Sequence, residues 1–376
     1  MRGVLQVLLL SLAVLLVKAT IPVVFIHFNT CSEPHAVEQA AIIAGKVIYV
    51  GEQGCHFLAP QNTEITYMDV NALQTTETSK VAKIYPPAAS SGLAELKKTF
   101  EVQCITRHFI LREVMRQTGL DMVAYLDHDV MLYIPPDTLL EKVTEAMRIR
   151  PDIVLATSND IAGAAYTSMW TLDGITSVCA FILEAMTYNP KVAFNDMQLT
   201  ALYYNKSRDL TVDITLPRAS APFKVALLTD IPGRDAALEL TMGDNLLIFD
   251  PKFHDNETSM LLLPPNPHPR TPHESVEVKR VFFCDRSPML YDTKTEQFVA
   301  VGALHFRGPC KDMQQFYLNW KKNDCVCDDV LCSSCLPMPD FFARMPELTE
   351  KYSRACKSDS DADTDVGDEG IDEELY

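Results

Sequence analysis

The sequence predicts an α/β domain in which helices flank a mostly parallel sheet. Short apolar runs recur along the chain, and each ends in residues that favour turns. Stretches with helical periodicity separate these runs, which is the spacing of strand–helix–strand units. The run Met122–Leu126 leads directly into Asp127-His128-Asp129. Two carboxylates are therefore expected at the carboxyl end of a buried strand, where open α/β sheets bind ligands.

The N-terminal part predicts a strand–helix–strand unit and a further strand. Strands at Ile21–Phe28 and Lys46–Val50 flank a helix at Pro34–Ala44, and Glu64–Val70 forms the third strand. Such a unit makes a right-handed crossover in a parallel sheet. No G-x-G-x-x-G follows the first strand, so a nucleotide would have to bind by another device.

A long helix is predicted after the break at Ser90-Ser91-Gly92, and Gly119 ends it. Helical spacing predicts the face that packs on the sheet: Cys104, His108, Leu111, Val114 and Met115. The arginines fall on other faces, where most arginines are solvated: Arg107, Arg112 and Arg116.

The chain beyond the Asp-x-Asp strand predicts further alternation of helix and strand. The expected elements are a helix from Pro136 to about Arg150, a strand at Ile153–Ala156, a loop of small and aromatic residues at Ala162–Trp170, a helix at Leu172–Thr187, and a helix opened by Asn195-Asp196. Residues 206–280 are expected to be irregular. Strand character returns at Val281–Cys284, Met289–Tyr291 and Phe298–Leu304, and the last strand leads into His305.

Composition and charge narrow the function classes. The chain is 47% hydrophobic with both signs of charge, as in a soluble globular protein. Its net charge of −17 argues against a nucleic-acid partner, because binding phosphates requires basic side chains. Much of that charge lies in the tail after Lys357, which has almost no apolar residues and is expected to be disordered.

The first nineteen residues resemble a secretory signal peptide. Arg2 precedes the apolar run Val4–Val17, and Ala19 suits cleavage. A cleaved signal would leave no stable membrane insertion and would place the chain in the secretory pathway, in the ER or Golgi lumen, or outside the cell. An uncleaved signal anchor is the alternative. Sequons at Asn205 and Asn256 are glycosylation acceptors in that compartment.

Eleven cysteines in an oxidising compartment indicate disulfides, and the odd number leaves at least one free thiol. Cys104 and Cys179 lie in apolar helical stretches and are the expected free thiols. A C-terminal cluster is expected to form disulfides, with zinc binding as the alternative: Cys325, Cys327, Cys332 and Cys335.

Three local features suit one chemistry. Asp127 and Asp129 can hold a divalent cation, Mn²⁺ or Mg²⁺, and His305 could complete its ligands. Lys311 lies six residues beyond that histidine and could meet a phosphate. This set suits a nucleotide diphosphate, whose developing charge a metal ion neutralises as it leaves.

At these residues the sequence resembles glycosyltransferases of the GT-A fold, which use nucleotide sugars. Asp127-His128-Asp129 looks like their DxD motif, and His305-Phe-x-Gly308-x-x-Lys311 looks like a motif of the glycogenin-like branch. Softer likenesses to nucleotide-diphospho-sugar transferases lie between these motifs: Phe100-Glu101-x-x-Cys104-x-x-Arg107-x-Phe109, Thr167-Ser-x-Trp170 and Asn195-Asp-Met197. The likeness spans roughly residues 21–320.

The resemblance implies roles for particular residues. The metal ligands would be Asp127, Asp129 and His305, and Asp196 would be the catalytic carboxylate near the transferred sugar, with a helix cap as the alternative for Asp196. The residues expected at the donor nucleotide, with a UDP-sugar favoured, are Asn29, Thr30, Arg107, His128, Gly308 and Lys311. The acceptor would be a glycan, a protein or a small molecule. The family's Lys-Pro-Trp ending is missing after Lys311, which leaves retention of configuration in doubt.

The resemblance also implies a domain organisation. A GT-A-like (Rossmann-like) catalytic domain would span 20–320, preceded by the signal peptide at 1–19. A Cys-rich segment at 321–357 and the acidic tail at 358–376 would follow.

Two other functions compete with sugar transfer. Asp127-x-Asp129 resembles the opening of haloacid-dehalogenase-type phosphohydrolases, in which Asp127 would be the nucleophile. Their nucleophile normally lies on the first strand, whereas several predicted strands precede Asp127. A secreted binding protein on a decayed transferase fold is the other alternative.

Overall fold

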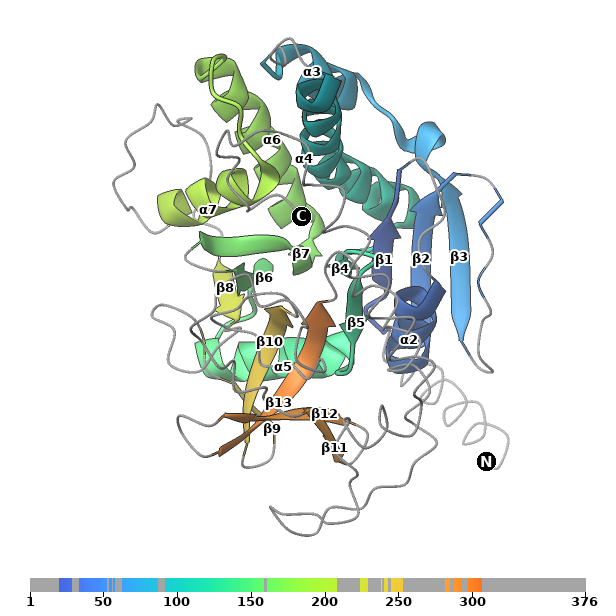
Figure 1. Ribbon diagram of the computed structural model, residues 1–376, viewed down its shortest axis with the longest axis vertical. Helices are drawn as coiled ribbons and strands as arrows, with labels where there is room; N and C mark the ends of the chain where they lie inside the picture. The colour runs from blue at the N-terminus through green and yellow to red at the C-terminus, as the bar shows by residue number, and fades with distance from the viewer. Residues whose placement is uncertain are drawn as a thin grey trace, which may run out of the picture.

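The computed structural model confirms the predicted fold class, a mostly parallel sheet with helices on both faces (Figure 1). It describes residues 20–28, 34–52, 54–55, 57, 63–86, 92–158, 161–207, 224–228, 238, 240–242, 245–252, 281–284, 287–292 and 297–305. The main sheet has seven strands in the order β3-β2-β1-β4-β7-β6-β8. Of these, β7 alone runs antiparallel to its neighbours.

Four parallel strands form the half of this sheet that carries the Asp-x-Asp turn. Their bounds are β1 Val23–Ile26, β2 Lys46–Gly51, β3 Glu64–Asp69 and β4 Met122–Leu126. Every residue of β1 is buried, and alternate residues enter two different cores. Val23 and Phe25 face one core while Val24 and Ile26 face the other, so β1 is covered on both sides. This is why its sequence is continuously apolar.

Helices complete the two cores. One face is covered by α3 (Thr76–Ile84), α4 (Gly92–Thr118), α6 (Leu172–Tyr188) and α7 (Asp196–Ser207), and the other by α2 (Pro34–Ala44) and α5 (Pro136–Met147) (Figure 1). The long helix α4 ends where Gly119 adopts a φ of 68°, a left-handed conformation that glycine tolerates best. The chain then enters β4 directly.

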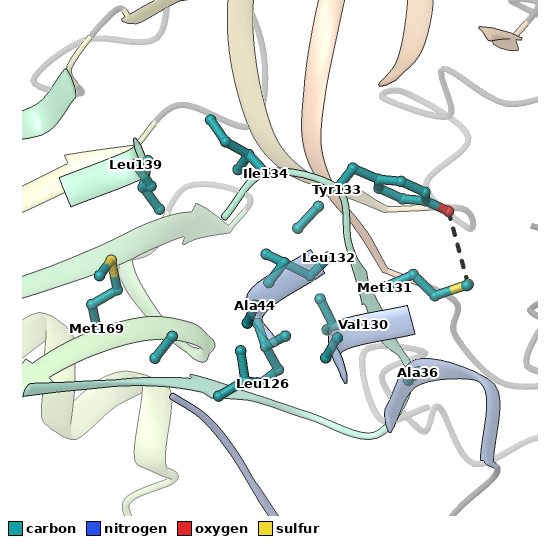
Figure 2. Close-up of a cluster of buried hydrophobic side chains, with 14 of the residues drawn as sticks. Ala36, Ala44, Leu126, Val130, Met131, Leu132, Tyr133, Ile134, Leu139 and Met169 are labelled. Carbon is teal, nitrogen blue, oxygen red and sulfur yellow. Dashed lines mark hydrogen bonds between the residues drawn. The ribbon is translucent and has the colours of Figure 1, made fainter. Parts of the chain in front are cut away.

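A second sheet lies beside the first and brings a distant segment to the Asp-x-Asp turn. It contains β9 (Leu240–Met242), β10 (Asn245–Lys252), β11 (Val281–Cys284), β12 (Ser287–Asp292), β13 (Gln297–His305) and β5 (Val130–Leu132). The short strand β5 follows the turn and pairs antiparallel with β13. Figure 2 shows Val130 and Leu132 gathered with Ala36 and Ala44 of α2, which anchors β5 in the core.

The predicted loop at Ala162–Trp170 is wrong, because this segment lies within the strand β7 (Ile161–Thr171). Small residues have little intrinsic strand preference, and the sequence does not reveal that partners lie on both sides. Here residues Thr167–Thr171 of β7 pair with β4, and β7 pairs with β6 (Ile153–Ser158) on its other edge. Tertiary pairing therefore decides the conformation of this segment.

Residues 206–280 also contain regular structure, contrary to the prediction. Strand β8 (Val225–Leu228) pairs parallel with β6, and β9 and β10 belong to the second sheet. Strands of three or four residues give little periodic signal. β8 is defined by pairing with β6, which lies far away along the chain, whereas β9 pairs with the adjacent β10. Helix α3 was not predicted either, although Thr75 and Thr78 form a reciprocal capping box at its start.

Two arginines of α4 are buried, whereas the sequence predicted mostly solvated arginines. Arg107 and Arg112 are both buried, and only Arg116 lies largely in solvent. The predicted free thiols are confirmed, since neither Cys104 nor Cys179 forms a disulfide. Within the described ranges, no helix is long and apolar enough to cross a membrane. The signal peptide, the Cys-rich segment and the acidic tail lie outside those ranges.

Candidate functional site

The candidate site forms where β4 ends and the chain turns into β5. The amide of Val130 donates to the carbonyl of Asp127 at 3.0 Å, which closes a tight turn through His128 and Asp129. The amide of Asp127 donates to the carbonyl of Tyr166 on β7 at 2.9 Å. The turn is thereby fixed between two strands, with both carboxylates at the carboxyl edge of the sheet, as predicted.

His305 reaches this turn through strand pairing. It is the last residue of β13, and the antiparallel register places it opposite Val130, directly after Asp129. The His305 Nε2 lies 3.4 Å from the Asp129 Oδ1, and both residues are buried. The ring of Tyr166 packs against the imidazole at a centroid distance of 4.6 Å. The structure therefore brings together two of the three predicted metal ligands.

Asp127 has a different partner. The Arg107 Nη1 donates to the Asp127 Oδ1 at 2.6 Å, and the Tyr125 hydroxyl donates to the same oxygen at 2.5 Å. The other arm of the guanidinium, Nη2, pairs with the Asp196 Oδ2. Arg107 thus joins the carboxylate at the end of β4 to the first residue of α7. We call Tyr125, Asp127, Arg107 and Asp196 the arginine cluster.

The structure gives Arg107 and Asp196 contacts that the sequence did not predict. Arg107 is 8% exposed, and both of its terminal nitrogens bind carboxylates, so its place is structural support beneath the site. Asn195 caps α7, because its side-chain oxygen accepts from the amide of Gln198 at 2.7 Å. Asp196 is therefore not the cap, and its buried carboxylate belongs to the arginine cluster.

Burial and charge shift several pKa values around the cluster. Burial lowers the pKa of Arg107, but Asp127, Tyr125 and Asp196 together raise it well above its ordinary value. Burial also raises the pKa of the Tyr125 phenol. The cluster therefore keeps its charges at physiological pH: the guanidinium stays protonated and the phenol stays neutral.

Two neighbours on α4 should give opposite pH dependences of stability. Burial lowers the pKa of His108 to about 4, while burial and then Asp196 raise the pKa of Glu101 to about 7. Below its usual pKa of 6.5, unfolded His108 takes up a proton that the native ring refuses, so its contribution falls from pH 6.5 to 4. Native Glu101 holds its proton above its usual pKa of 4.5, so its contribution falls as the pH rises from 4.5 to 7.

Denaturant unfolding between pH 4.5 and 6.5 tests both signs. In wild type, His108 should lower the free energy of unfolding by up to about 1.4 kcal/mol for each pH unit of acidification. His108→Gln removes this decrease, so the variant should gain stability relative to wild type as the pH falls. Glu101→Gln should show the opposite trend and lose stability relative to wild type as the pH falls. Parallel pH curves for wild type and both variants would contradict these assignments.

His128, the middle residue of the turn, faces the neighbouring strand end. Its ring lies edge-on to that of His27, which follows β1, at a centroid distance of 4.7 Å. The ends of β1 and β4 are thus in contact at the site. The other residues predicted at the donor nucleotide lie outside the described residues: Asn29, Thr30, Gly308 and Lys311.

The side chains at the turn include ligands for the predicted cation. Among the residues that the structure describes, no three His, Cys, Asp or Glu side chains form a metal-binding group. Asp129 and His305 nevertheless supply one carboxylate and one imidazole, ligands that suit Mn²⁺. The residues fit a cation held by this pair, with Asp127 close by in sequence but bound to Arg107.

Sequence reasoning missed the two tyrosines of the site. Tyr125 lies two residues before Asp127 on β4, and side chains with that spacing share a face of a strand, so periodicity could have indicated it. Tyr166 was placed in a predicted loop, and its position beside His305 depends on the pairing of β7. No local signal reveals that contact.

Comparisons with known proteins give a fold-level likeness only. Neither the protein-family models nor the curated proteins contain a match to the sequence. Mouse xyloside xylosyltransferase 1 in its apo form is similar in structure, with 11% identity, 50% of this chain and 83% of that chain covered, and a TM-score of 0.33. The PaToxG glycosyltransferase is similar with 12% identity, 49% and 69% coverage, and a TM-score of 0.30. At these scores the function has to be argued from the site.

Proposed function

We propose that this chain is a metal-dependent glycosyltransferase of the secretory pathway. It would move a sugar from a nucleotide-diphosphate donor to a hydroxyl group of a glycan, protein or small-molecule acceptor. The observation that supports this most is the buried pair of Asp129 and His305, with Nε2 and Oδ1 3.4 Å apart, at the carboxyl edge of the sheet. The pairing of β13 with β5 brings these two ligand types together from segments far apart in the sequence.

The Asp129–His305 pair and the arginine cluster would have different roles at the site. Asp129 and His305 would hold Mn²⁺ or Mg²⁺, and a bound cation neutralises charge that develops on a departing diphosphate. Tyr166 packs on the imidazole and limits its rotation. Arg107 and Tyr125 fix Asp127, so the turn keeps its shape without relaxing when a ligand arrives. Such preorganisation lowers the activation barrier by stabilising the transition state.

The predicted contacts of Lys311 and Gly308 with the donor remain part of this proposal. A lysine that follows β13 would add a positive point charge for the diphosphate. The arginine cluster supplies no such charge, because Arg107 is neutralised by two carboxylates. The proposal therefore needs a basic group from beyond His305.

The contacts of Asp127 do not support the phosphohydrolase alternative. A nucleophilic Asp127 would have to attack with a carboxylate that accepts from both Arg107 and Tyr125. Hydrogen bonds to a carboxylate stabilise its charge and so reduce its tendency to attack. The decayed-fold alternative would not require Asp129 and His305 to stay paired.

Nucleotide release from the full-length secreted chain tests the proposal. The chain is incubated with Mn²⁺ and UDP-, GDP- or CMP-sugars, and release of the nucleotide is measured with and without candidate acceptors. We expect turnover with one donor, its loss on chelation and its return with Mn²⁺. The Tm of the protein should rise when Mn²⁺ and the matching nucleotide are both present. Phosphate release with an aspartyl-phosphate intermediate would instead favour the phosphohydrolase.

A further inference from the structure

The short strand β5 fixes how Asp129 meets His305. It has three residues, Val130–Leu132, and Asp129 directly precedes them. Among the described strands, β13 is the one that pairs with β5, and its register sets His305 opposite Val130. A shift of β5 along β13 would move the carboxylate of Asp129 away from the imidazole. The geometry of the pair therefore depends also on what holds the other edge of β5.

The side chain of Gln39, on α2, reaches that other edge. Its Nε2 donates to the carbonyl of Leu132 at 3.2 Å, although the two residues lie 93 positions apart in the sequence. Ala36, one turn earlier on α2, belongs to the same core cluster as Val130 and Leu132 (Figure 2). Its small side chain lets α2 lie close enough to β5 for the amide to reach the strand. A backbone carbonyl in so buried a position needs a hydrogen-bond partner, and Gln39 supplies one.

Stability alone does not explain a glutamine at this position. Gln39 is 0% exposed, and its amide oxygen Oε1 has no hydrogen-bond partner among the residues that the structure describes. Burying a polar atom without a partner costs free energy, and this cost is comparable in size to the gain from one hydrogen bond. The amide of Gln39 therefore adds little net stability, and what it supplies is the contact with β5.

We infer that Gln39 is a positioning residue: by binding the carbonyl of Leu132 it holds β5, and with it Asp129, in place beside His305 for cation binding. This inference rests on the proposed function, in which Asp129 and His305 hold Mn²⁺ or Mg²⁺. Residues that orient metal ligands without touching the metal typically change its affinity by about 10- to 100-fold when they are removed. Gln39 acts through the strand that follows Asp129, so we expect an effect at the lower end of this range.

Gln39→Met tests this role, because methionine keeps the length and the unbranched shape of the side chain but has no amide to donate a hydrogen bond. In the full-length chain, the Kd for Mn²⁺, measured by electron paramagnetic resonance, should rise about 10-fold. The Tm without Mn²⁺ should stay close to that of wild type, and excess Mn²⁺ should restore sugar transfer. Amide hydrogen exchange of the peptide Leu126–Ile134 should become faster, because β5 loses a contact on one edge.

Tyr203→Phe is the matched control. It also removes one hydrogen bond between distant segments, from the Tyr203 hydroxyl to the Ser177 Oγ at 3.1 Å, but in the core on the opposite face of the main sheet. Its Kd for Mn²⁺ and its exchange at Leu126–Ile134 should match wild type.

Three results would overturn the role of Gln39 and leave the proposed function standing. The first is a Kd for Mn²⁺ in Gln39→Met equal to that of wild type, and the second is unchanged exchange over Leu126–Ile134. The third is a fall in Tm larger than that of Tyr203→Phe, which would show that Gln39 supports the fold as a whole. A wild-type chain that binds no Mn²⁺ would overturn both the inference and the proposed function.

Discussion

Asp129→Asn is expected to lower sugar transfer by about 10²–10³, or roughly 3–4 kcal/mol of transition-state stabilisation. Asparagine keeps the shape of the side chain but removes the negative charge that faces the His305 Nε2 at 3.4 Å. The cation that this pair would hold acts mainly on a developing charge, so turnover should fall more than donor binding. His305→Gln should have a milder effect, because it removes a neutral ligand.

Two measurements separate this effect from misfolding. Far-UV circular dichroism and the Tm of Asp129→Asn should match wild type, while the Kd for Mn²⁺, measured by electron paramagnetic resonance, should rise. The control is Asp121→Asn, an exposed aspartate directly before β4, which should leave transfer unchanged. An Asp129→Asn protein that folds and transfers sugar at the wild-type rate would contradict the proposed metal site.

The sequence predicts the strand ends of this site well. Met122–Leu126 is a continuous apolar run that stops at Asp127, and β13 reaches His305, one residue beyond its predicted end at Leu304. Both signals are local: burial on two faces demands apolar residues, and the first charged or polar residue indicates where the strand ends. The positions of Asp129 and His305 along their strands therefore follow from residue type alone.

The contacts between those strand ends do not follow from residue type. His305 meets Asp129 because β13 pairs with β5, in a register that depends on the whole second sheet. Asp127 was predicted to be a metal ligand, and its ion pair with Arg107 depends on how α4 packs against β4 and α7. Helical periodicity gave Arg107 a helix face, but it could not show that two carboxylates, the half-buried Asp127 and the buried Asp196, would pair with its side chain there.

Arg107→Met is expected to lower the free energy of unfolding by about 3–5 kcal/mol. The substitution keeps an unbranched side chain but leaves Asp127 and Asp196 without their shared cation. Asp196 has a side chain only 7% exposed, so its charge would remain in a poorly solvated place. Adding Asp127→Asn and Asp196→Asn to Arg107→Met should recover part of the loss, since neutral amides are cheaper to bury.

The same helix offers graded controls for this prediction. Arg112 is as deeply buried as Arg107, but its partners are Glu77, with a side chain 37% exposed, and Glu113, which Arg116 also contacts. Arg112→Met therefore leaves one carboxylate that water can solvate and one that keeps a second cation. Arg116 is exposed, and its partner Glu113 keeps Arg112 when Arg116 is replaced, so the loss should resemble that of a surface pair, about 0–1 kcal/mol in most proteins. In urea unfolding, the decrease in the free energy of unfolding should therefore be largest for Arg107→Met, smaller for Arg112→Met and smallest for Arg116→Met. A loss at Arg107 no larger than that at Arg116 would mean that the arginine cluster does not hold Asp127, and the turn would then owe its shape to the backbone bonds with Tyr166 and Val130 alone.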